Sequence, residues 1–165
     1  MSLQLQNVEA VLAVDIMNGL AKNNQIPWKS KTDMKFFKNK TIYNTVIMGS
    51  KTLLSLPNAA PLKNRINIVI TSNKEMYLNK YRDAPNIFFF DIEEIIVFMK
   101  KNTNTKFYII GGNKIYNLLL PYCSRIWLTK IKKDYKCDLM FNYNISVYTK
   151  EVIYDDSELE IQHLH

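Results

Sequence analysis

The chain has 165 residues, 47% of them hydrophobic and 22% charged, which is typical of one soluble globular domain with a sizeable core. No apolar run approaches the roughly 18 residues of a membrane span, and the N-terminal residues lack the features of a signal peptide. Two cysteines (Cys123, Cys137) and two histidines (His163, His165) give no disulfide framework and too few ligands for a zinc site. We therefore expect a single domain over residues 1–165, cytoplasmic, with no membrane segment and no metal.

The formal net charge of +7 is compatible with two classes of partner. Nucleic-acid binding is one, but the lysines are scattered along the chain rather than gathered in a block. The other is a small anionic ligand, because a basic surface steers phosphates and carboxylates toward a cleft. The scatter favours the small anion.

The first half of the chain alternates apolar runs with helical periodicity. The expected elements are, in order, a strand over 8–15, a loop over 16–28, a helix from Ser30 or Thr32 to about Thr41, a strand over 44–49, a helix over 50–56 and a strand over 65–72. The first helix has apolar positions at Met34, Phe36 and Phe37.

The second half continues this alternation and ends differently. The expected elements are a strand over 86–90, a helix over 92–101, a strand over 107–112, a helix over 113–120, a strand over 125–131, and a hairpin of 146–154 with 159–164. Asp91 and Glu94 fit a capping box at the start of the helix over 92–101, and Pro121 ends the helix over 113–120. The pattern predicts an α/β fold of three layers: a mostly parallel central sheet, helices on both faces and a C-terminal antiparallel hairpin, with ligands at the carboxyl ends of the strands.

Glycine is scarce, with four residues against an average share of about 7%. Three of the four lie where a strand gives way to a helix: Gly49 in VIMGSKT, and Gly111 and Gly112 in YIIGGNKIY. A helix N-terminus attracts anions, and glycine lets an anion approach the backbone, so two such junctions suggest a ligand with more than one phosphate. The alternative is that these glycines only form tight turns. Neither junction is the G-x-G-x-x-G motif of a Rossmann fold.

Asp33 is the acidic residue of a lysine-rich stretch, IPWKSKTDMKFFKNK, and has three interpretations. It could complete a capping box with Ser30, balance the surrounding lysines, or be a carboxylate held in an apolar pocket to do chemistry. Met34 and Phe37 lie beside it in the helix and are expected to desolvate it, which would raise its pKa.

Seven segments together resemble the dihydrofolate reductase family, in order and spacing, over nearly the whole chain. They are AVLAVDIMNGLAKNNQIPW, TDMKFFK, VIMGSKT, PLKNRINIVITS, YIIGGNKIYNLLLP, IWLTKI and CDLMF. The resemblance implies NADPH-dependent reduction of 7,8-dihydrofolate to tetrahydrofolate, with hydride transfer to pterin C6 and protonation of N5 assisted by Asp33. It also implies a monomer that needs no nucleic acid, unless the chain is the front part of a fusion with thymidylate synthase.

The resemblance assigns roles to individual residues. The catalytic set it implies is Asp33, Thr129, Ile26 and Trp28. The substrate-binding set is Ala13, Met34, Phe37, Leu56, Leu62, Arg65, Ile110 and Tyr116, with Arg65 clamping the glutamate carboxylate. The cofactor-binding set is Ala13, Gly19, Ile26, Gly49, Ser50, Lys51, Thr52, Thr71, Ser72, Ile110, Gly111, Gly112, Asn113, Lys114, Ile115 and Tyr116. Residues 19–26 resemble the family's mobile loop, Asp138 an acid near it, and Gly111-Gly112 its paired glycine, joined by a cis peptide bond.

One departure and two other activities bear on these assignments. Many relatives carry a basic residue at Ser50, so the choice of NADPH over NADH depends here on Lys51, Thr71 and Ser72. The pyrimidine reductase of riboflavin synthesis shares the fold, but TDMKFFK and PLKNR favour folate. A nucleotide-binding module without catalysis should lack the pocket acid, and Asp33 is present.

Overall fold

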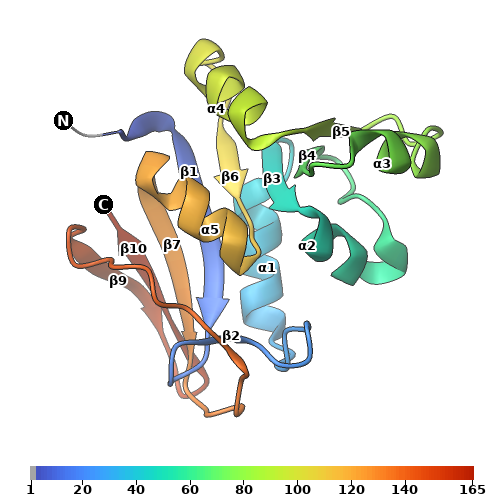
Figure 1. Ribbon diagram of the computed structural model, residues 1–165. Coiled ribbons are helices and arrows are strands. Elements are labelled where there is room, and N and C mark those ends of the chain that lie inside the picture. Colours follow the sequence, from blue (N-terminus) through green and yellow to red (C-terminus); the bar gives the residue numbers. More distant parts are fainter. Residues whose placement is uncertain (1–2) are drawn as a thin grey trace.

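The structure, a computed structural model, describes residues 3–165 and is built around one eight-stranded sheet (Figure 1). The strand order is β5-β4-β3-β6-β1-β7-β10-β9. From β5 to β7 neighbouring strands pair in parallel, whereas β10 runs antiparallel to both β7 and β9. The strands are β1 (Leu5–Val14), β3 (Thr45–Gly49), β4 (Ile66–Ile70), β5 (Ile87–Phe90), β6 (Phe107–Ile109), β7 (Cys123–Ile131), β9 (Lys150–Asp155) and β10 (Leu159–Leu164). The predicted sheet and C-terminal hairpin are confirmed.

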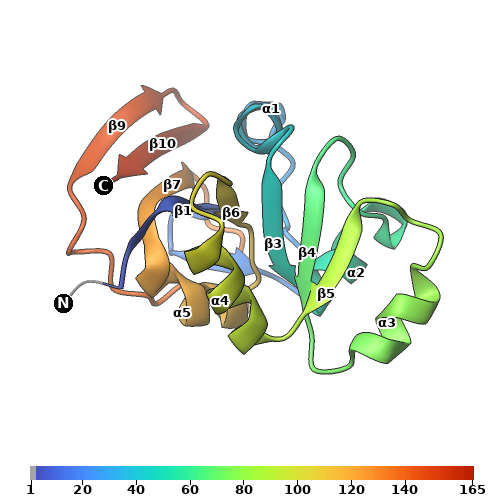
Figure 2. The ribbon, with the colours of Figure 1, turned by 90° about the horizontal axis from the view of Figure 1, so that it is seen from above.

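Helices cover both faces of this sheet. They are α1 (Lys31–Thr41), α2 (Ser50–Ser55), α3 (Lys74–Lys80), α4 (Ile92–Lys101) and α5 (Asn113–Leu119). Figure 2 shows α1 on one side of the sheet and α4 and α5 on the other. Successive residues of β3 divide between the two faces: Val46 and Met48 join the hydrophobic cluster that includes residues of α1, α2 and α3, while Ile47 joins the cluster that includes α4 and α5. A strand covered on both faces needs an unbroken apolar run, as in TVIMG.

Local sequence signals set the ends of the helices. Ser30 is the N-cap of α1, because its Oγ accepts a hydrogen bond from the Asp33 N–H. The capping box predicted from Asp91 and Glu94 is present at the start of α4. Helix α5 passes into a short 3₁₀ turn, Leu120–Tyr122, where Pro121 cannot continue the α-helical hydrogen bonding.

Four elements were not predicted. The predicted loop 16–28 contains a short strand, β2 (Gly19–Ala21), which pairs with β8 (Leu139–Met140) in a second small sheet. Helix α3 and a 3₁₀ turn over Pro57–Ala59 also lie where no element was predicted. Helix α3 lacked a signal because Tyr77 is its one buried residue, whereas Met76 and Leu78 are exposed.

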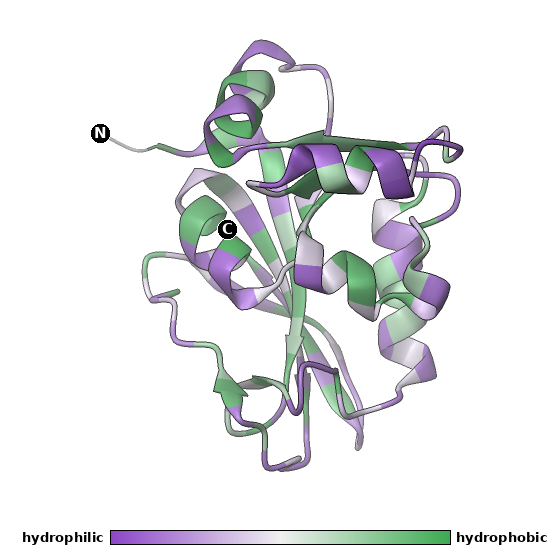
Figure 3. Cartoon of the chain, turned by 45° about the vertical axis from the view of Figure 1, so that its right-hand side comes forward, coloured by the Kyte–Doolittle hydropathy of each residue, from purple (hydrophilic) through white to green (hydrophobic). Residues whose placement is uncertain are grey.

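The carboxyl ends of β1, β3 and β6 point toward the same edge of the sheet, which we call the carboxyl edge (Figure 1). Hydrophobic segments concentrate in the central strands, whereas the helices carry hydrophilic stretches (Figure 3). Among residues 3–165, no helix is long and apolar enough to cross a bilayer.

Candidate active site

Asp33 lies in the first turn of α1, and its carboxylate accepts a hydrogen bond from the hydroxyl of Thr129 on β7. Thr129 is 1% exposed, so the hydroxyl is held inside the protein. Ser30 supplies the helix cap, with 3.1 Å between its Oγ and the Asp33 nitrogen. The Asp33 side chain therefore faces β7 and is not needed to complete the helix cap.

The surroundings of Asp33 raise its pKa above the ordinary value. Burial of the carboxyl is the main cause, the Thr129 hydrogen bond opposes it, and the negative charge of Glu158 adds to it. Met34 was expected to share in this burial, but its side chain is 67% exposed. That expectation is corrected: Met34 is on the exposed side of α1, whereas Phe36 and Phe37 pack against the hydrophobic cluster.

Four of the predicted apolar site residues share one environment. They are half-buried at the border of the cluster under α1, α2 and α3: Phe37, Leu56, Leu62 and Ile110. Ala13 is also half-buried, but it packs against a separate cluster that contains Trp28, Ile131 and Leu159. Partly exposed apolar side chains of this kind can contact a flat ligand without disturbing the core.

Arg65 is half-buried beside α1 and is held by neutral groups. Its Nη1 donates to the Thr41 hydroxyl at 3.0 Å, and its Nε donates to the Lys63 carbonyl at 3.0 Å. Within the described residues it forms no ion pair, and burial lowers the pKa of its guanidinium. A half-buried guanidinium without an acidic partner is suited to bind a carboxylate from a ligand.

Asn67, which the sequence did not single out, fixes the loop that carries Leu62 and Arg65. Its side chain is fully buried on β4, accepts from the Leu62 N–H at 2.9 Å, and donates to the carbonyls of Leu62 and Arg65 at 3.0 and 3.1 Å. Asn86 donates to the same two carbonyls at 3.1 and 3.2 Å. A polar residue inside the apolar run INIVI was the available signal, since buried amides need partners.

The two glycine junctions lie against each other. The Gly49 N–H donates to the Gly111 carbonyl at 2.8 Å. A Cβ added to Gly49 would lie 3.0 Å from Ile115 Cγ1, and one added to Gly112 would lie 3.4 Å from Thr52 Oγ1. The predicted cis peptide bond between Gly111 and Gly112 is present. The starts of α2 and α5 therefore lie close together, and Gly49 has little room for a side chain.

Gly111 and Tyr116 tie this region to the centre of the sheet. Gly111 has a φ of +112°, a conformation that favours glycine, and an added Cβ would lie 3.1 Å from the Tyr116 ring. The buried Tyr116 hydroxyl donates to the Val11 carbonyl on β1 at 3.0 Å. Tyr116 is therefore a packed residue of the sheet that also borders the glycine pair.

The residues predicted to select the cofactor directly follow two adjacent strands, β3 and β4. Gly49 pairs in register with Ile70, so Ser50 and Lys51 follow β3 next to the point where Thr71 and Ser72 follow β4. Lys51 and Ser72 are exposed, and Ser50 and Thr71 are half-buried. This places one cation and three hydroxyls on neighbouring turns of the carboxyl edge.

Asp15 organises the loop after β1, a role that sequence reasoning missed. The carboxylate is fully buried; Oδ1 accepts from the N–H groups of Met17 and Gly19 at 2.9 and 2.7 Å, and Oδ2 accepts from that of Tyr135 at 3.0 Å. Burial raises its pKa, but the hydrogen bonds from Tyr135, Gly19 and Met17 outweigh this and lower the pKa below its usual value. The D-x-x-x-G spacing after a buried strand was the signal.

The far part of the same loop is held more weakly. The Asn23 N–H donates to the Asp138 carboxylate at 3.0 Å in an exposed setting, and Ile26 is 64% exposed. Trp28, at the end of the loop, is 5% exposed, and among the described residues its Nε1 is a buried donor without a hydrogen-bond partner. A donor of this kind needs water or a ligand to satisfy it.

Comparison with known proteins gives consistent matches. The dihydrofolate reductase family model matches residues 7–159. A bifunctional dihydrofolate reductase-thymidylate synthase from Paramecium tetraurelia is 38% identical over 137 residues, which make up 82% of this chain. Dihydrofolate reductase from Staphylococcus haemolyticus is 29% identical over 134 residues, 81% of this chain and 75% of the relative. The solved structure of dihydrofolate reductase from Enterococcus faecalis, complexed with NADP(H) and RAB-propyl, has a TM-score of 0.81 and 28% identity, covering 98% of this chain and 97% of that one.

Two of the relatives are much longer than this chain. It spans 28% of the Paramecium protein and 25% of segregation and condensation protein A from Mycoplasmoides gallisepticum, to which it is 30% identical over 157 residues, 93% of this chain. The chain therefore matches one part of these longer proteins.

Proposed function

Because the chain belongs to the dihydrofolate reductase family, we propose that it reduces 7,8-dihydrofolate to tetrahydrofolate with NADPH. When bound, NADPH supplies the hydride that C6 of the pterin receives, and a proton has to reach N5 for the C=N bond to be reduced. The observation that carries the proposal is the Asp33–Thr129 pair: a carboxylate whose pKa is raised by burial, oriented by a buried hydroxyl.

Asp33 holds the pterin and assists its protonation. Its carboxylate accepts hydrogen bonds from N3–H and the 2-amino group, while Thr129 orients it. A carboxylate engaged at that end of the ring cannot reach N5 as well, so a water or a ring tautomer relays the proton. The unpartnered Trp28 Nε1 supports a water nearby, because a buried water needs such donors.

The remainder of the substrate extends along α1 toward Arg65. The half-buried side chains of Phe37, Leu56 and Leu62 contact the p-aminobenzoyl group. Arg65 binds the α-carboxylate of the glutamate, replacing part of its present hydrogen bonding to Thr41 and Lys63.

The two glycine junctions fit a pyrophosphate. A side chain at Gly49 would meet Ile115 and one at Gly112 would contact Thr52, so the absence of Cβ atoms lets the starts of α2 and α5 lie close together, where their first N–H groups can bind one anion. Thr52 and residues 113–115 complete this cradle, and Ala13, Ile110 and Tyr116 border the nicotinamide. Lys51, Thr71 and Ser72 contact the 2′-phosphate, which is the basis for a preference for NADPH over NADH.

The test is the loss of NADPH absorbance when dihydrofolate is added to the purified protein. We expect turnover with dihydrofolate, none with the aminopyrimidine substrate of riboflavin synthesis, and a higher kcat/KM for NADPH than for NADH. Turnover of the pyrimidine alone would overturn the proposal in favour of the other reductase. Equal kcat/KM for the two cofactors would contradict the role given to Lys51.

Assembly and location stay predictions. We infer a cytoplasmic monomer that acts without nucleic acid, or the reductase part of a fusion, since one relative is a bifunctional reductase-synthase. A sizing column run on the native protein distinguishes the two: a mass near 19.4 kDa supports the monomer, and a larger single chain supports the fusion.

A further inference from the structure

We propose that Glu151, His163 and His165 bind a divalent transition metal, with Zn²⁺ the best match. His163 and His165 lie two residues apart at the end of the chain described here, and Glu151 of β9 pairs directly with His163 of β10. Their ligand atoms all lie within 4.8 Å of one another. Counting only cysteines and histidines predicted no metal site, because that count leaves out a carboxylate brought in by the neighbouring strand.

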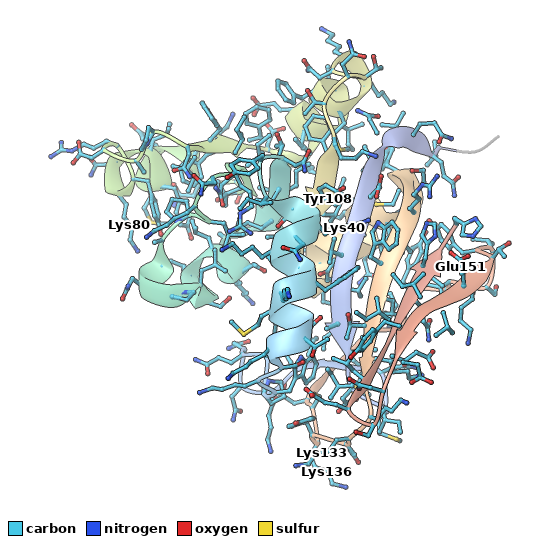
Figure 4. The ribbon with its side chains drawn as sticks, turned by 180° about the vertical axis from the view of Figure 1, so that it is seen from behind. Lys40, Lys80, Tyr108, Lys133, Lys136 and Glu151 are labelled. Carbon is cyan, nitrogen blue, oxygen red and sulfur yellow. The ribbon has the colours of Figure 1, made fainter. Side chains whose placement is uncertain are left out.

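The site lies on the C-terminal hairpin, where Figure 4 shows Glu151 at the outer edge of the sheet. None of its residues belongs to the proposed folate and NADPH site, and the inference does not depend on that function. Two imidazole nitrogens and one carboxylate oxygen form a ligand set common for zinc, and they leave a fourth position for water.

The central ligand is already fixed in place. The His163 ring is 8% exposed and stacks between Trp127, at 4.0 Å and 7°, and His165, at 4.5 Å and 28°. Lys40 lies over the Trp127 ring, 3.3 Å from its centroid. The His165 backbone is held by two hydrogen bonds with Thr149, of 2.6 and 3.0 Å. The His163 ring and the His165 backbone therefore have little conformational freedom left to lose when the ion binds.

The remaining adjustment involves exposed side chains. His163 Nδ1 is 3.3 Å from Glu151 Oε1, and zinc holds nitrogen and oxygen ligands at about 2.0–2.2 Å. Tetrahedral coordination brings ligand atoms to within about 3.5 Å of each other, so the side chains of Glu151 and His165 need to close by roughly 1 Å. Both side chains are exposed, and His165 has to rotate out of its stack on His163, because an imidazole nitrogen binds a metal in the plane of its ring.

Arg125 opposes binding and thereby provides a sharp test. Its Nη1 lies 3.0 Å from His163 Nε2, where it can only donate, so Nε2 accepts and Nδ1 carries the proton. A metal at Nδ1 requires that proton to move to Nε2, which displaces the exposed Arg125 side chain. Its positive charge also repels the cation. Removing Arg125 should strengthen metal binding.

The experiment is calorimetric titration of metal-free protein with zinc chloride, comparing the wild type with four variants. We expect one Zn²⁺ per chain in the wild type. Glu151→Gln and His165→Ala should weaken binding by at least about 10-fold, because even groups that only orient a ligand contribute on that scale. Arg125→Met should tighten it. Glu75→Gln, which makes the same chemical change at an exposed position of α3, should leave it unchanged.

Thermal unfolding gives a second readout that does not involve activity. Zinc should raise the Tm of the wild type and of Glu75→Gln, but not that of Glu151→Gln or His165→Ala. Absence of saturable binding in the wild type would overturn the proposal. So would binding that persists undiminished in Glu151→Gln and His165→Ala, which would place the ion on another group such as Cys137.

Discussion

The buried Thr129 hydroxyl, in the middle of β7, hydrogen-bonds the Asp33 carboxylate in the first turn of α1. This bond joins the sheet to the one acidic residue of a lysine-rich helix. The sequence alone allowed Asp33 either to complete the helix cap or to serve as a pocket carboxylate, and the structure gives these two roles to different residues. Ser30 caps the helix, so a change at Asp33 can alter chemistry while the helix start stays intact.

Asp33→Asn should lower kcat by about 10²-fold or more at neutral pH, the scale of positioned acid–base help. The amide keeps the shape and the oxygen that Thr129 contacts, but it cannot ionise. Steady-state rates across pH measure the effect, which should shrink as pH falls because protonated substrate becomes available from solution. Full activity across the range would show that Asp33 has no catalytic role.

The same variant should be more stable than the wild type at neutral pH. Burial raises the pKa of Asp33, so the ionised carboxylate destabilises the folded state above its folded-state pKa. The cost is absent below the ordinary value of 3.8, where both folded and unfolded chains are protonated, and it grows as pH rises from there until it is complete above the raised folded-state pKa. Urea unfolding over this range tests the sign, with Asp83→Asn, an exposed acid, as control. A variant less stable than the wild type at neutral pH would contradict the assignment.

Thr129→Val should move the pKa of Asp33 upward. The hydroxyl hydrogen bond favours the ionised carboxylate, so its loss leaves burial less opposed. The net worth of such a bond, about 0.5–1.5 kcal/mol, corresponds to a change of about 2- to 13-fold in kcat/KM. A carbon-13 titration of the Asp33 carboxyl measures the shift directly. An unmoved titration would mean that Thr129 does not orient this group.

Arg65→Ala should raise the KM for dihydrofolate by a factor of about 10 to 150, since a charge-assisted pair contributes roughly 1.5–3 kcal/mol. The guanidinium lies far from the reacting ring in the proposed binding mode, so kcat should change little. Arg82→Ala, at an exposed arginine, is the matched control and should leave both constants unchanged. An unchanged KM in the Arg65 variant would show that the glutamate carboxylate binds elsewhere.

Asp15→Asn should loosen the loop after β1. The carboxylate accepts three backbone N–H groups, and the amide places a donor where one of them now points. We expect faster proteolysis within residues 16–26 and a loss of about 1–3 kcal/mol in unfolding free energy at neutral pH. Because the pKa of Asp15 is lowered, the stabilisation is present above 3.8 and is lost as pH falls through its folded-state pKa.

The control for that loop is Asp138→Asn, which affects one exposed hydrogen bond from Asn23. It should change stability by less than about 1 kcal/mol. Equal effects of the two substitutions would mean that Asp15 has no special part in ordering the loop.

Much of the fold followed from apolar periodicity, because strands buried on both faces and capped helices leave strong local patterns. The apolar runs TVIMG and INIVI predicted β3 and β4, and Asp91 with Glu94 predicted the start of α4. Helix α3 left no such pattern, since just one of its residues is buried. Strand β8 has two residues and depends on its partner β2 more than on its own sequence.

The candidate site was predictable in its residue types but not in its contacts. Resemblance supplied Asp33, Thr129 and Arg65, whereas the hydrogen bonds of Asp15 and Asn67 depend on loops that meet only in the folded chain. Met34 shows the limit of helical periodicity: its position in α1 suggested burial, but its side chain is 67% exposed, whereas the neighbouring Asp33 faces β7.

Strand β1 precedes the other strands of the sheet in the sequence, yet it lies between β6 and β7. Its partners begin at Phe107 and Cys123, so a growing chain on the ribosome holds an apolar strand with two unpaired edges until most of the sequence has emerged. Loop closure over such distances is slow, and exposed strand edges promote aggregation. From this strand order we expect the chain to depend on chaperones during synthesis, and fragments that end before β6 to be insoluble.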